Sequence, residues 1–538
     1  MKSFRFAALC CIALSAPLAA QSPAKPKLVV AIAVDQLSSD LFEAYRLHFT
    51  RGLKRLSSGT VFRNGYQAHA ASETCPGHST ILTGSHPART GIIANNWFDP
   101  ALANDKKVYC AEDVRRRPPP VDGKSGGYTV SATHLKVPTL GDRMKAANPA
   151  SRVVSVAGKD RAAVMLAGHR GDQVWWWSGK GFTSNLTPRP AAVVAQVNSG
   201  IAKLIARPRP DLIPPPLCAA MARRLDIPGD RDLGIVRFGR AAGDAAAYRN
   251  SPEVDGATLV LAAGLARELR LGSGAATDLL AIGLSATDFV GHAYGNGGIE
   301  MCLQMMSLDR DLGDFLGFLD RLGVDYVVTL TADHGVADVP ERDDDPVTQR
   351  IDASLTLENI DSNVRSKLGL SRPVLLGEGI GDIYVDRTLA PAVRARVIDA
   401  TVRFLTAQPQ VHSVLRAADI AKLAIPTGAP SGWTVPQRVR ASFDAQRSGD
   451  LIAILKSGIT QIAAPGPTYA AAHGSPWDYD RRVPIMFWRK GAEAQERSEA
   501  IATVDIMPTL ASMIGLAIPA RQIDGRCLAV NGSTCPRR

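Results

Sequence analysis

The chain has 538 residues, a formal net charge of +11 and 46% hydrophobic residues, so it is long enough for a large core and about three domain-sized units. A basic balance suits anionic substrates, although an ordinary solvated surface often has the same balance. No dense run of Lys and Arg with interleaved aromatic residues occurs. We therefore expect no nucleic-acid partner.

Residues 1–20 have the pattern of a secretory signal peptide, with Lys2 and Arg5 before an apolar run and a stretch of small residues. A membrane anchor is the alternative, but the apolar run is short for a span. Leu9 stands directly before Cys10, where a lipoprotein would have a small residue. We expect a protein exported to the bacterial periplasm, without stable membrane insertion, as a monomer or a dimer.

Six cysteines remain after removal of such a peptide, and an even number in an exported protein predicts disulfides. Cys527 and Cys535 are close in sequence and are expected to pair. For the other four cysteines we choose one of several connectivities. The predicted pairs are Cys75–Cys110, Cys218–Cys302 and Cys527–Cys535. A cysteine-rich zinc site is the alternative, but no CxxC spacing supports it.

The first predicted element is a buried strand at 27–34, a continuous β-branched apolar run that ends before Asp35. A helix is expected over 39–56. A second strand at 153–157 precedes the sequence GKDRA. Residues 175–177 are three consecutive tryptophans, and we expect them in a strand where they pack against the core.

The alternation of strands and helices continues after an irregular Pro-rich linker at 207–216. A strand at 279–284 ends in SATDFVGHAYG, a long amphipathic helix covers 299–322, and a strand at 326–331 ends in ADHG. Nearly every predicted strand thus ends in an acidic or histidine-bearing loop. This pattern predicts an α/β fold with a parallel sheet and a site along one edge.

The pattern changes after residue 338, where acidic loops accompany short strands such as 382–385 and a helix near 391–405. The main sheet resumes at 483–488, and a helix at 505–514 closes the fold. The predicted division is a signal peptide at 1–20, a core at 21–337 and 465–538, and an inserted subdomain at 338–464.

Residues 71–99 predict a loop that runs into a helix, with Pro76 and Gly77 near the helix start. Thr74 would then lie near a helix N-terminus, where free N–H groups and the helix dipole favour an anion. A threonine hydroxyl acts as a nucleophile only if a base or a metal activates it. The alternative is that Thr74 merely caps the helix.

Metal-ligand residue types occur in four of the loops. Carboxylate and imidazole together suit Zn²⁺, whereas Mg²⁺ prefers oxygen ligands. Each residue alone has another explanation. Asp35 could cap the next helix, and Asp288 and His292 could form a hydrogen bond within their loop. His473 could be an ordinary surface histidine. Two metals roughly 4 Å apart would form a clamp for phosphoryl transfer and would activate the Thr74 hydroxyl. The candidate ligands are Asp35, Asp288, His292, Asp333, His334 and His473.

These motifs together resemble the alkaline phosphatase superfamily, and in particular the secreted, phosphate-irrepressible alkaline phosphatases with a threonine nucleophile. The motifs that carry the resemblance span nearly all of the mature chain: Asp35, ETCPGH through TGIIANNWFD, GKDRA, TDFVGH, TADHG, AHGSP and DGRCL. The resemblance implies a three-layer sandwich with a largely parallel central sheet, two Zn²⁺ and a covalent phospho-threonine intermediate. It implies one zinc held by Asp288, His292 and His473. It implies a second zinc held by Asp35, Asp333 and His334, with Thr74 bridging to it.

The same resemblance implies that Asn95, Lys159 and Arg161 hold the non-bridging phosphate oxygens. The chemistry agrees, because a phosphomonoester dianion needs positive charge there and a guanidinium can bind two oxygens. A surface salt-bridge pair is the alternative for Lys159 and Arg161. Asn96 is the neighbouring alternative to Asn95.

We therefore expect an alkaline phosphatase acting on phosphate monoesters, with weaker phosphodiesterase activity. The first alternative is a nucleotide pyrophosphatase/phosphodiesterase. The pair Lys159 and Arg161 argues against it, because a diester has one oxygen esterified and carries less charge. A sulfatase is disfavoured. Sulfatases convert the Cys or Ser of a C/S-x-P-x-R motif to formylglycine, whereas here Thr74 stands at the first position and His78 at the position of the Arg. The alternative of another class is a non-catalytic metal-dependent binding protein, which would be expected to lack the nucleophile or a ligand.

Overall fold

The computed structural model describes residues 24–99, 106–116, 128–228, 233–343 and 345–535. The predicted signal peptide at 1–20 lies outside these residues. Among the helices of the described segments, none is both long and apolar enough to span a membrane.

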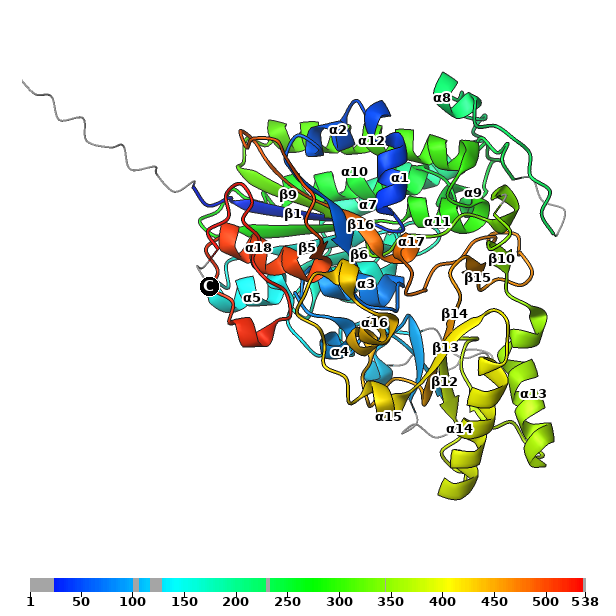
Figure 1. Ribbon diagram of the computed structural model, residues 1–538. Helices are drawn as coiled ribbons and strands as arrows, with labels where there is room; N and C mark the ends of the chain where they lie inside the picture. The colour runs from blue at the N-terminus through cyan, green and yellow to red at the C-terminus, as the bar shows by residue number, and fades with distance from the viewer. Residues whose placement is uncertain (1–23, 100–105, 117–127, 229–232, 344, 536–538) are drawn as a thin grey trace, which may run out of the picture.

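A ten-stranded sheet forms the centre of the molecule, with helices on both faces (Figure 1). Its strands are β1 (Leu28–Val34), β2 (Thr60–Tyr66), β5 (Val153–Ala157), β6 (Gln173–Trp177), β7 (Phe182–Thr183), β8 (Asp278–Leu284), β9 (Tyr326–Thr331), β16 (Arg482–Arg489), β17 (Gln495–Arg497) and β18 (Ile501–Ala502). Their order is β17-β2-β16-β9-β1-β8-β5-β6-β7, with β18 also paired to β2. The run β9-β1-β8-β5-β6 is parallel throughout. The prediction of an α/β fold with a largely parallel sheet is therefore confirmed.

The alternation of side chains along β1 explains the two helical layers. Successive side chains of a strand point to opposite faces of the sheet. Val30 and Ile32 join one apolar cluster, whereas Val29 and Ala31 join another. The first cluster includes residues of α1 (Ser39–Tyr45), α7 (Ala192–Ile205), α10 (Glu253–Glu268), α11 (Ala286–Tyr294) and α12 (Gly298–Arg321). The second includes residues of α3 (Thr74–Ile81), α5 (Leu140–Ala147), α6 (Asp160–Ala167) and α18 (Ile506–Met513).

One predicted helix, over 39–56, is wrong. The structure has α1, a 3₁₀ turn at Arg46–His48 and a separate helix α2 (Gly52–Leu56). The break is stabilised by Asp309 of α12, whose carboxylate accepts hydrogen bonds from the backbone N–H groups of Thr50, Arg51 and Leu53. A long-range contact of this kind has no signal in the local sequence.

The region between β9 and β16 has a smaller sheet of its own, seen at the lower right of Figure 1. The strands β11 (Leu375–Leu376), β12 (Asp382–Val385), β14 (Leu451–Leu455) and β13 (Val411–Arg416) form it in that order. It packs with α13 (Leu357–Leu368) and α14 (Pro391–Thr406) around a separate apolar cluster. The division at residues 338 and 464 stays a prediction.

The remaining shorter elements connect these layers. They are α4 (Pro87–Thr90), β3 (Asn96–Asp99), β4 (Lys106–Tyr109), α8 (Pro216–Ala219), α9 (Ala245–Arg249), β10 (Gln349–Arg350), α15 (Ala417–Ile420), α16 (Val435–Ser442), β15 (Ile459–Thr460) and α17 (Asp478–Arg481). All three predicted disulfides are present: Cys75–Cys110, Cys218–Cys302 and Cys527–Cys535.

Candidate active site

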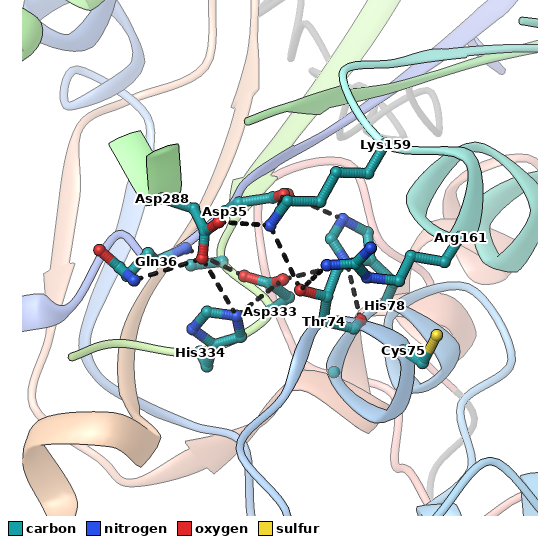
Figure 2. A network of polar contacts seen from close by, with 12 residues as sticks. Asp35, Gln36, Thr74, Cys75, His78, Lys159, Arg161, Asp288, Asp333 and His334 are labelled. Carbon is teal, nitrogen blue, oxygen red and sulfur yellow. Dashed lines mark hydrogen bonds and ion pairs between the residues drawn. The ribbon is translucent and has the colours of Figure 1, made fainter. Parts of the chain in front are cut away.

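Thr74 is the first residue of α3, and its hydroxyl faces two cationic side chains (Figure 2). Glu73 occupies the N-cap position with an extended backbone, so Thr74 does not cap the helix. Instead, Thr74 Oγ1 accepts hydrogen bonds from Lys159 Nζ at 3.3 Å and from Arg161 Nη2 at 3.4 Å. The hydroxyl is buried at a helix N-terminus and next to positive charge, which favours an anion at this position.

Three carboxylates meet near Thr74 because they follow neighbouring parallel strands. Asp35 follows β1, Asp333 lies just beyond β9, and Asp288 is in the first turn of α11 after β8. The carboxyl ends of parallel strands meet at one edge of a sheet, where α/β folds place their sites. Gly77 lets α3 approach this edge, because a Cβ atom at Gly77 would lie 2.1 Å from the carbonyl oxygen of Asp333.

Lys159 joins the hydroxyl to two of these carboxylates. It is the N-cap residue of α6, two residues after the end of β5, and its side chain is buried. Its Nζ lies 3.0 Å from Asp35 Oδ2 and 2.6 Å from Asp288 Oδ2 (Figure 2). The alternative that Lys159 belongs to a surface salt bridge is therefore wrong.

Asp288, His292 and His473 form the first group that could hold a cation, with ligand atoms all within 4.8 Å of one another. The Nε2 atoms of the two histidines lie 3.3 Å and 3.5 Å from Asp288 Oδ1. Their Nδ1 atoms contact backbone carbonyl oxygens of Ala471 and Ser72, at 2.8 Å and 2.7 Å. Such contacts orient Nε2 toward a metal. Burial lowers the pKa of His473 to about 3, which favours the neutral imidazole that metals require.

The second group that the geometry brings together is Asp35, His78 and Asp333. His78 lies between the two carboxylates, with Nε2 3.2 Å from Asp35 Oδ1 and Nδ1 3.2 Å from Asp333 Oδ2. Burial lowers its pKa, but the two carboxylates outweigh this effect and raise it to about 10. His334, which the sequence assigns to this group, has Nε2 3.2 Å from Asp333 Oδ2 and 3.9 Å from Asp288 Oδ1. It therefore stands between the two groups.

Several buried atoms at this edge make no aligned hydrogen bond among the described residues, although they face one another at 3.2 Å as carboxylate–imidazole pairs. They are Asp35 Oδ1, His78 Nε2, Asp333 Oδ2 and His334 Nε2. Buried polar atoms normally make well-aligned hydrogen bonds, so a convergent set of poorly aligned pairs requires an explanation. Carboxylate oxygens and imidazole nitrogens are the donor set that Zn²⁺ prefers. The residues present thus fit the metal centre that the sequence predicts.

Asn95 lies beside the helix start, and Asn96 does not. Asn95 Oδ1 accepts a hydrogen bond from the backbone N–H of Cys75 at 2.9 Å, and the backbone N–H of Asn95 donates to Glu73 Oε2 at 2.7 Å. The side-chain nitrogen Nδ2 of Asn95 has no protein acceptor among the described residues and is available to a ligand beside Thr74. Asn96 Nδ2 donates instead to Glu378, in the connection between β11 and β12, at 3.0 Å.

A sequence model of the type I phosphodiesterase / nucleotide pyrophosphatase family matches residues 29–476. The chain belongs to this family. It is 51% identical over 515 residues to the alkaline phosphatase PhoK of a Sphingomonas species, across 94% of this chain and 91% of that protein. It is 45% identical over 522 residues to the alkaline phosphatase PhoD of Zymomonas mobilis, across 95% and 89%.

The crystal structure of the alkaline phosphatase PafA has the same fold, with a TM-score of 0.79 and 26% sequence identity. The match covers 94% of this chain and 100% of that one. These comparisons confirm the resemblance to alkaline phosphatases and to type I nucleotide pyrophosphatases/phosphodiesterases that the motifs predict. The chain-wide coverage also means that the candidate site lies in the part that all these proteins share.

His78 is the residue at this site that sequence reasoning did not assign. It is four residues after Thr74, and this spacing places both on one side of α3, where His78 Nδ1 lies 2.9 Å from the carbonyl oxygen of Thr74. The helical spacing within TCPGH was the available signal. Its approach to Asp35 and Asp333 depends on how α3 docks against the sheet, and the sequence around His78 does not predict it.

Proposed function

We propose that the protein is an alkaline phosphatase that hydrolyses phosphate monoesters, with Thr74 as its nucleophile. The observation that carries the proposal is the Thr74 hydroxyl at the start of α3, within 3.4 Å of the cationic side chains of Lys159 and Arg161. The similarity to PhoK and PhoD, both named as alkaline phosphatases, supports the same activity.

The proposal includes two zinc ions. Asp288, His292 and His473 would hold one, and Asp35, Asp333 and His334 would hold the other beside the Thr74 hydroxyl. We assign His334 rather than His78 from the resemblance of the TADHG motif. The contacts of Nδ1 do not separate the two histidines, since His334 Nδ1 lies 3.0 Å from the carbonyl oxygen of Gly335 and His78 Nδ1 lies 2.9 Å from that of Thr74. When bound, such ions lower the pKa of a hydroxyl and stabilise charge on a departing oxygen.

The chain's own part in the reaction begins with Thr74 Oγ1, which attacks phosphorus as the ester P–O bond breaks and the alcohol departs. A phospho-threonine forms and is hydrolysed by water, which releases inorganic phosphate and restores the hydroxyl. Asn95, Lys159 and Arg161 hold the non-bridging oxygens, on which negative charge is concentrated in the transition state. Protons lost by the hydroxyl and gained by the alcohol exchange with water.

The same groups favour monoesters over diesters. A monoester dianion presents charged oxygens to both Lys159 and Arg161, whereas a diester has one oxygen esterified. Weaker phosphodiesterase activity is expected, since Thr74 and the metal groups serve both reactions. A nucleotide pyrophosphatase/phosphodiesterase remains the second candidate, favoured by the family to which the chain belongs.

The test compares kcat/KM for a monoester with that for its methyl diester, on protein of known zinc content. A preference for the monoester supports the phosphatase, and a preference for the diester supports the second candidate. Bound metal without turnover of either ester would support a non-catalytic metal-dependent binding protein.

We also propose export to the periplasm, from the signal-peptide pattern at residues 1–20. Amino-terminal sequencing of the protein from the periplasmic fraction should give a chain that begins near residue 21. Sedimentation of this mature protein decides between a monomer and a dimer.

A further inference from the structure

A cavity of about 570 Å³ opens beside the proposed phosphate site and is lined by Lys159, Arg161 and a third cation, Arg249. Asp160 also lines it, and both of its carboxylate oxygens accept hydrogen bonds from tyrosine hydroxyls, at 2.6 Å and 2.5 Å. The lining of the cavity therefore includes three cations but one carboxylate, and that carboxylate already accepts two hydrogen bonds. Such an excess of positive charge in a concave site favours an anionic ligand.

Arg249 is held in place by an aromatic ring of the site. It is the last residue of α9, and its guanidinium carbon lies 3.8 Å from the ring centroid of Phe289. The same ring lies 5.4 Å from Lys159 Nζ. Phe289 directly follows Asp288 in α11. The stacking thus fixes Arg249 on the side of the site that α11 forms, without using its hydrogen-bond donors.

The charge of Arg249 has no counterion in the described part of the chain. No carboxylate there lies within ion-pair distance of it, and its hydrogen bond goes to the adjacent Asn250 side chain at 3.3 Å. Lys159, by contrast, contacts two carboxylates, and Arg161 contacts Thr74. Arg161 also has a buried Nε atom without a partner among the described residues. Lys159 and Arg161 are thus placed for the reacting phosphate, and Arg249 is left for a different anion.

We propose that Arg249 determines specificity by binding a second anionic group of the substrate. The preferred substrates are phosphate monoesters that carry a further phosphate or carboxylate group a few bonds from the reacting phosphate. This inference rests on the proposed function. The reacting group binds at Thr74, Lys159 and Arg161, and the rest of the substrate enters the cavity toward Arg249. Because the second group takes no part in bond breaking, its contact strengthens binding and lowers KM while kcat changes little.

The test uses the zinc-loaded enzyme and the mono- and bisphosphates of ethane-1,2-diol, propane-1,3-diol and butane-1,4-diol. The phosphate ester of 3-hydroxypropanoate tests a carboxylate as the second group. Arg249→Met keeps the contact with Phe289 but removes the charge, and Arg249→Lys retains a charge. Arg170→Met is the matched control, because Arg170 is an exposed arginine beyond the far end of α6 and outside the cavity.

We expect the wild-type enzyme to prefer the best bisphosphate about tenfold in kcat/KM, beyond the statistical factor for two equivalent esters. The preference should appear in KM and should weaken at high ionic strength. Arg249→Met should abolish it while leaving the diol monophosphates unchanged, Arg249→Lys should restore part of it, and Arg170→Met should keep it. A similar gain with the carboxylate ester would show that any anion suffices, and a gain with bisphosphates alone would narrow the site to phosphate.

Binding measured by calorimetry separates this inference from the proposed function. Propane-1,3-bisphosphonate should bind the wild-type protein more tightly than propylphosphonate, and Arg249→Met should remove most of the difference. This result would support the anion site even if no monoester were hydrolysed, an outcome that would overturn the proposed function alone. Equal losses on all substrates in Arg249→Met, or a wild-type enzyme without preference in both assays, would overturn the inference.

Discussion

Replacement of Arg161 by alanine should separate monoester from diester hydrolysis. Arg161 offers two donors to a bound phosphoryl group: Nη2, which lies 3.4 Å from Thr74 Oγ1, and Nε, which is buried and without a partner among the described residues. A hydrogen bond to a charged group contributes roughly 1.5–3 kcal/mol. Loss of both should therefore lower kcat/KM for a monoester by about 10² to 10⁴, since 1.4 kcal/mol is tenfold. A methyl diester has one of these oxygens esterified, so only one hydrogen bond is lost, and its kcat/KM should fall by only about 10 to 10².

The single variant is cleaner than one that also removes Lys159. Lys159 Nζ contacts both Asp35 and Asp288, so its loss would leave two buried carboxylates facing each other without a cation and would disturb the metal groups as well. The assay measures kcat/KM for a monoester and its methyl diester in wild type, Arg161→Ala and Arg161→Lys, with zinc content and melting temperature as controls. Arg161→Lys should recover part of the monoester rate. If both esters lose the same factor, Arg161 supports the fold or general binding, and the argument for a phosphatase from this residue fails.

Three further predictions concern the nucleophile, the metal and pH. Thr74→Ala should lose most of its turnover and form no phosphorylated enzyme on rapid quenching, whereas Thr74→Ser should retain much of both; full activity in Thr74→Ala would remove this residue from the mechanism. Elemental analysis should find about two zinc ions per chain, and His334→Ala should lose about one of them while His78→Ala keeps both; zinc addition should also raise the melting temperature of wild type. Burial raises the pKa of Asp255 from 3.8 to about 7, so the folded state retains a proton that the unfolded state releases between these values. Stability should fall as pH rises through this window, and Asp255→Asn should gain roughly 3 kcal/mol relative to wild type between pH 5 and pH 8 in urea titrations; a pH-independent difference would contradict the assignment.

The fold was predictable wherever the hydrophobic pattern is local. The continuous apolar run of β1 and the loops that follow β8 and β9 indicated parallel strands with a common edge, and the pairing β9-β1-β8 agrees. The helix predicted over 39–56 failed because Asp309, more than two hundred residues away, accepts the backbone N–H groups at the break. Strand order and the antiparallel entry of β16 also depend on contacts that no local pattern encodes.

The candidate site shows the same division between local and long-range information. Asp288 and His292 are paired through the family resemblance, and the sequence predicts them in a loop. The structure places them one turn apart in α11, with Asp288 Oδ1 3.3 Å from His292 Nε2. The contacts of Lys159 with Asp35 and Asp288 and the placement of His78 between Asp35 and Asp333 could not be predicted. Each depends on the docking of one element against another rather than on the residues around it.

The Cys75–Cys110 disulfide helps to hold Asn95 near Thr74. Cys75 follows Thr74 directly, and its backbone N–H donates to Asn95 Oδ1 at 2.9 Å. The backbone N–H of Cys110 donates to the carbonyl oxygen of Asn95 at 3.0 Å. Asn95 is therefore held from both ends of one disulfide, which links the paired strands β3 and β4 to the start of α3. Disulfides form in oxidising compartments, so this connection between Asn95 and the start of α3 agrees with the proposed export of the protein.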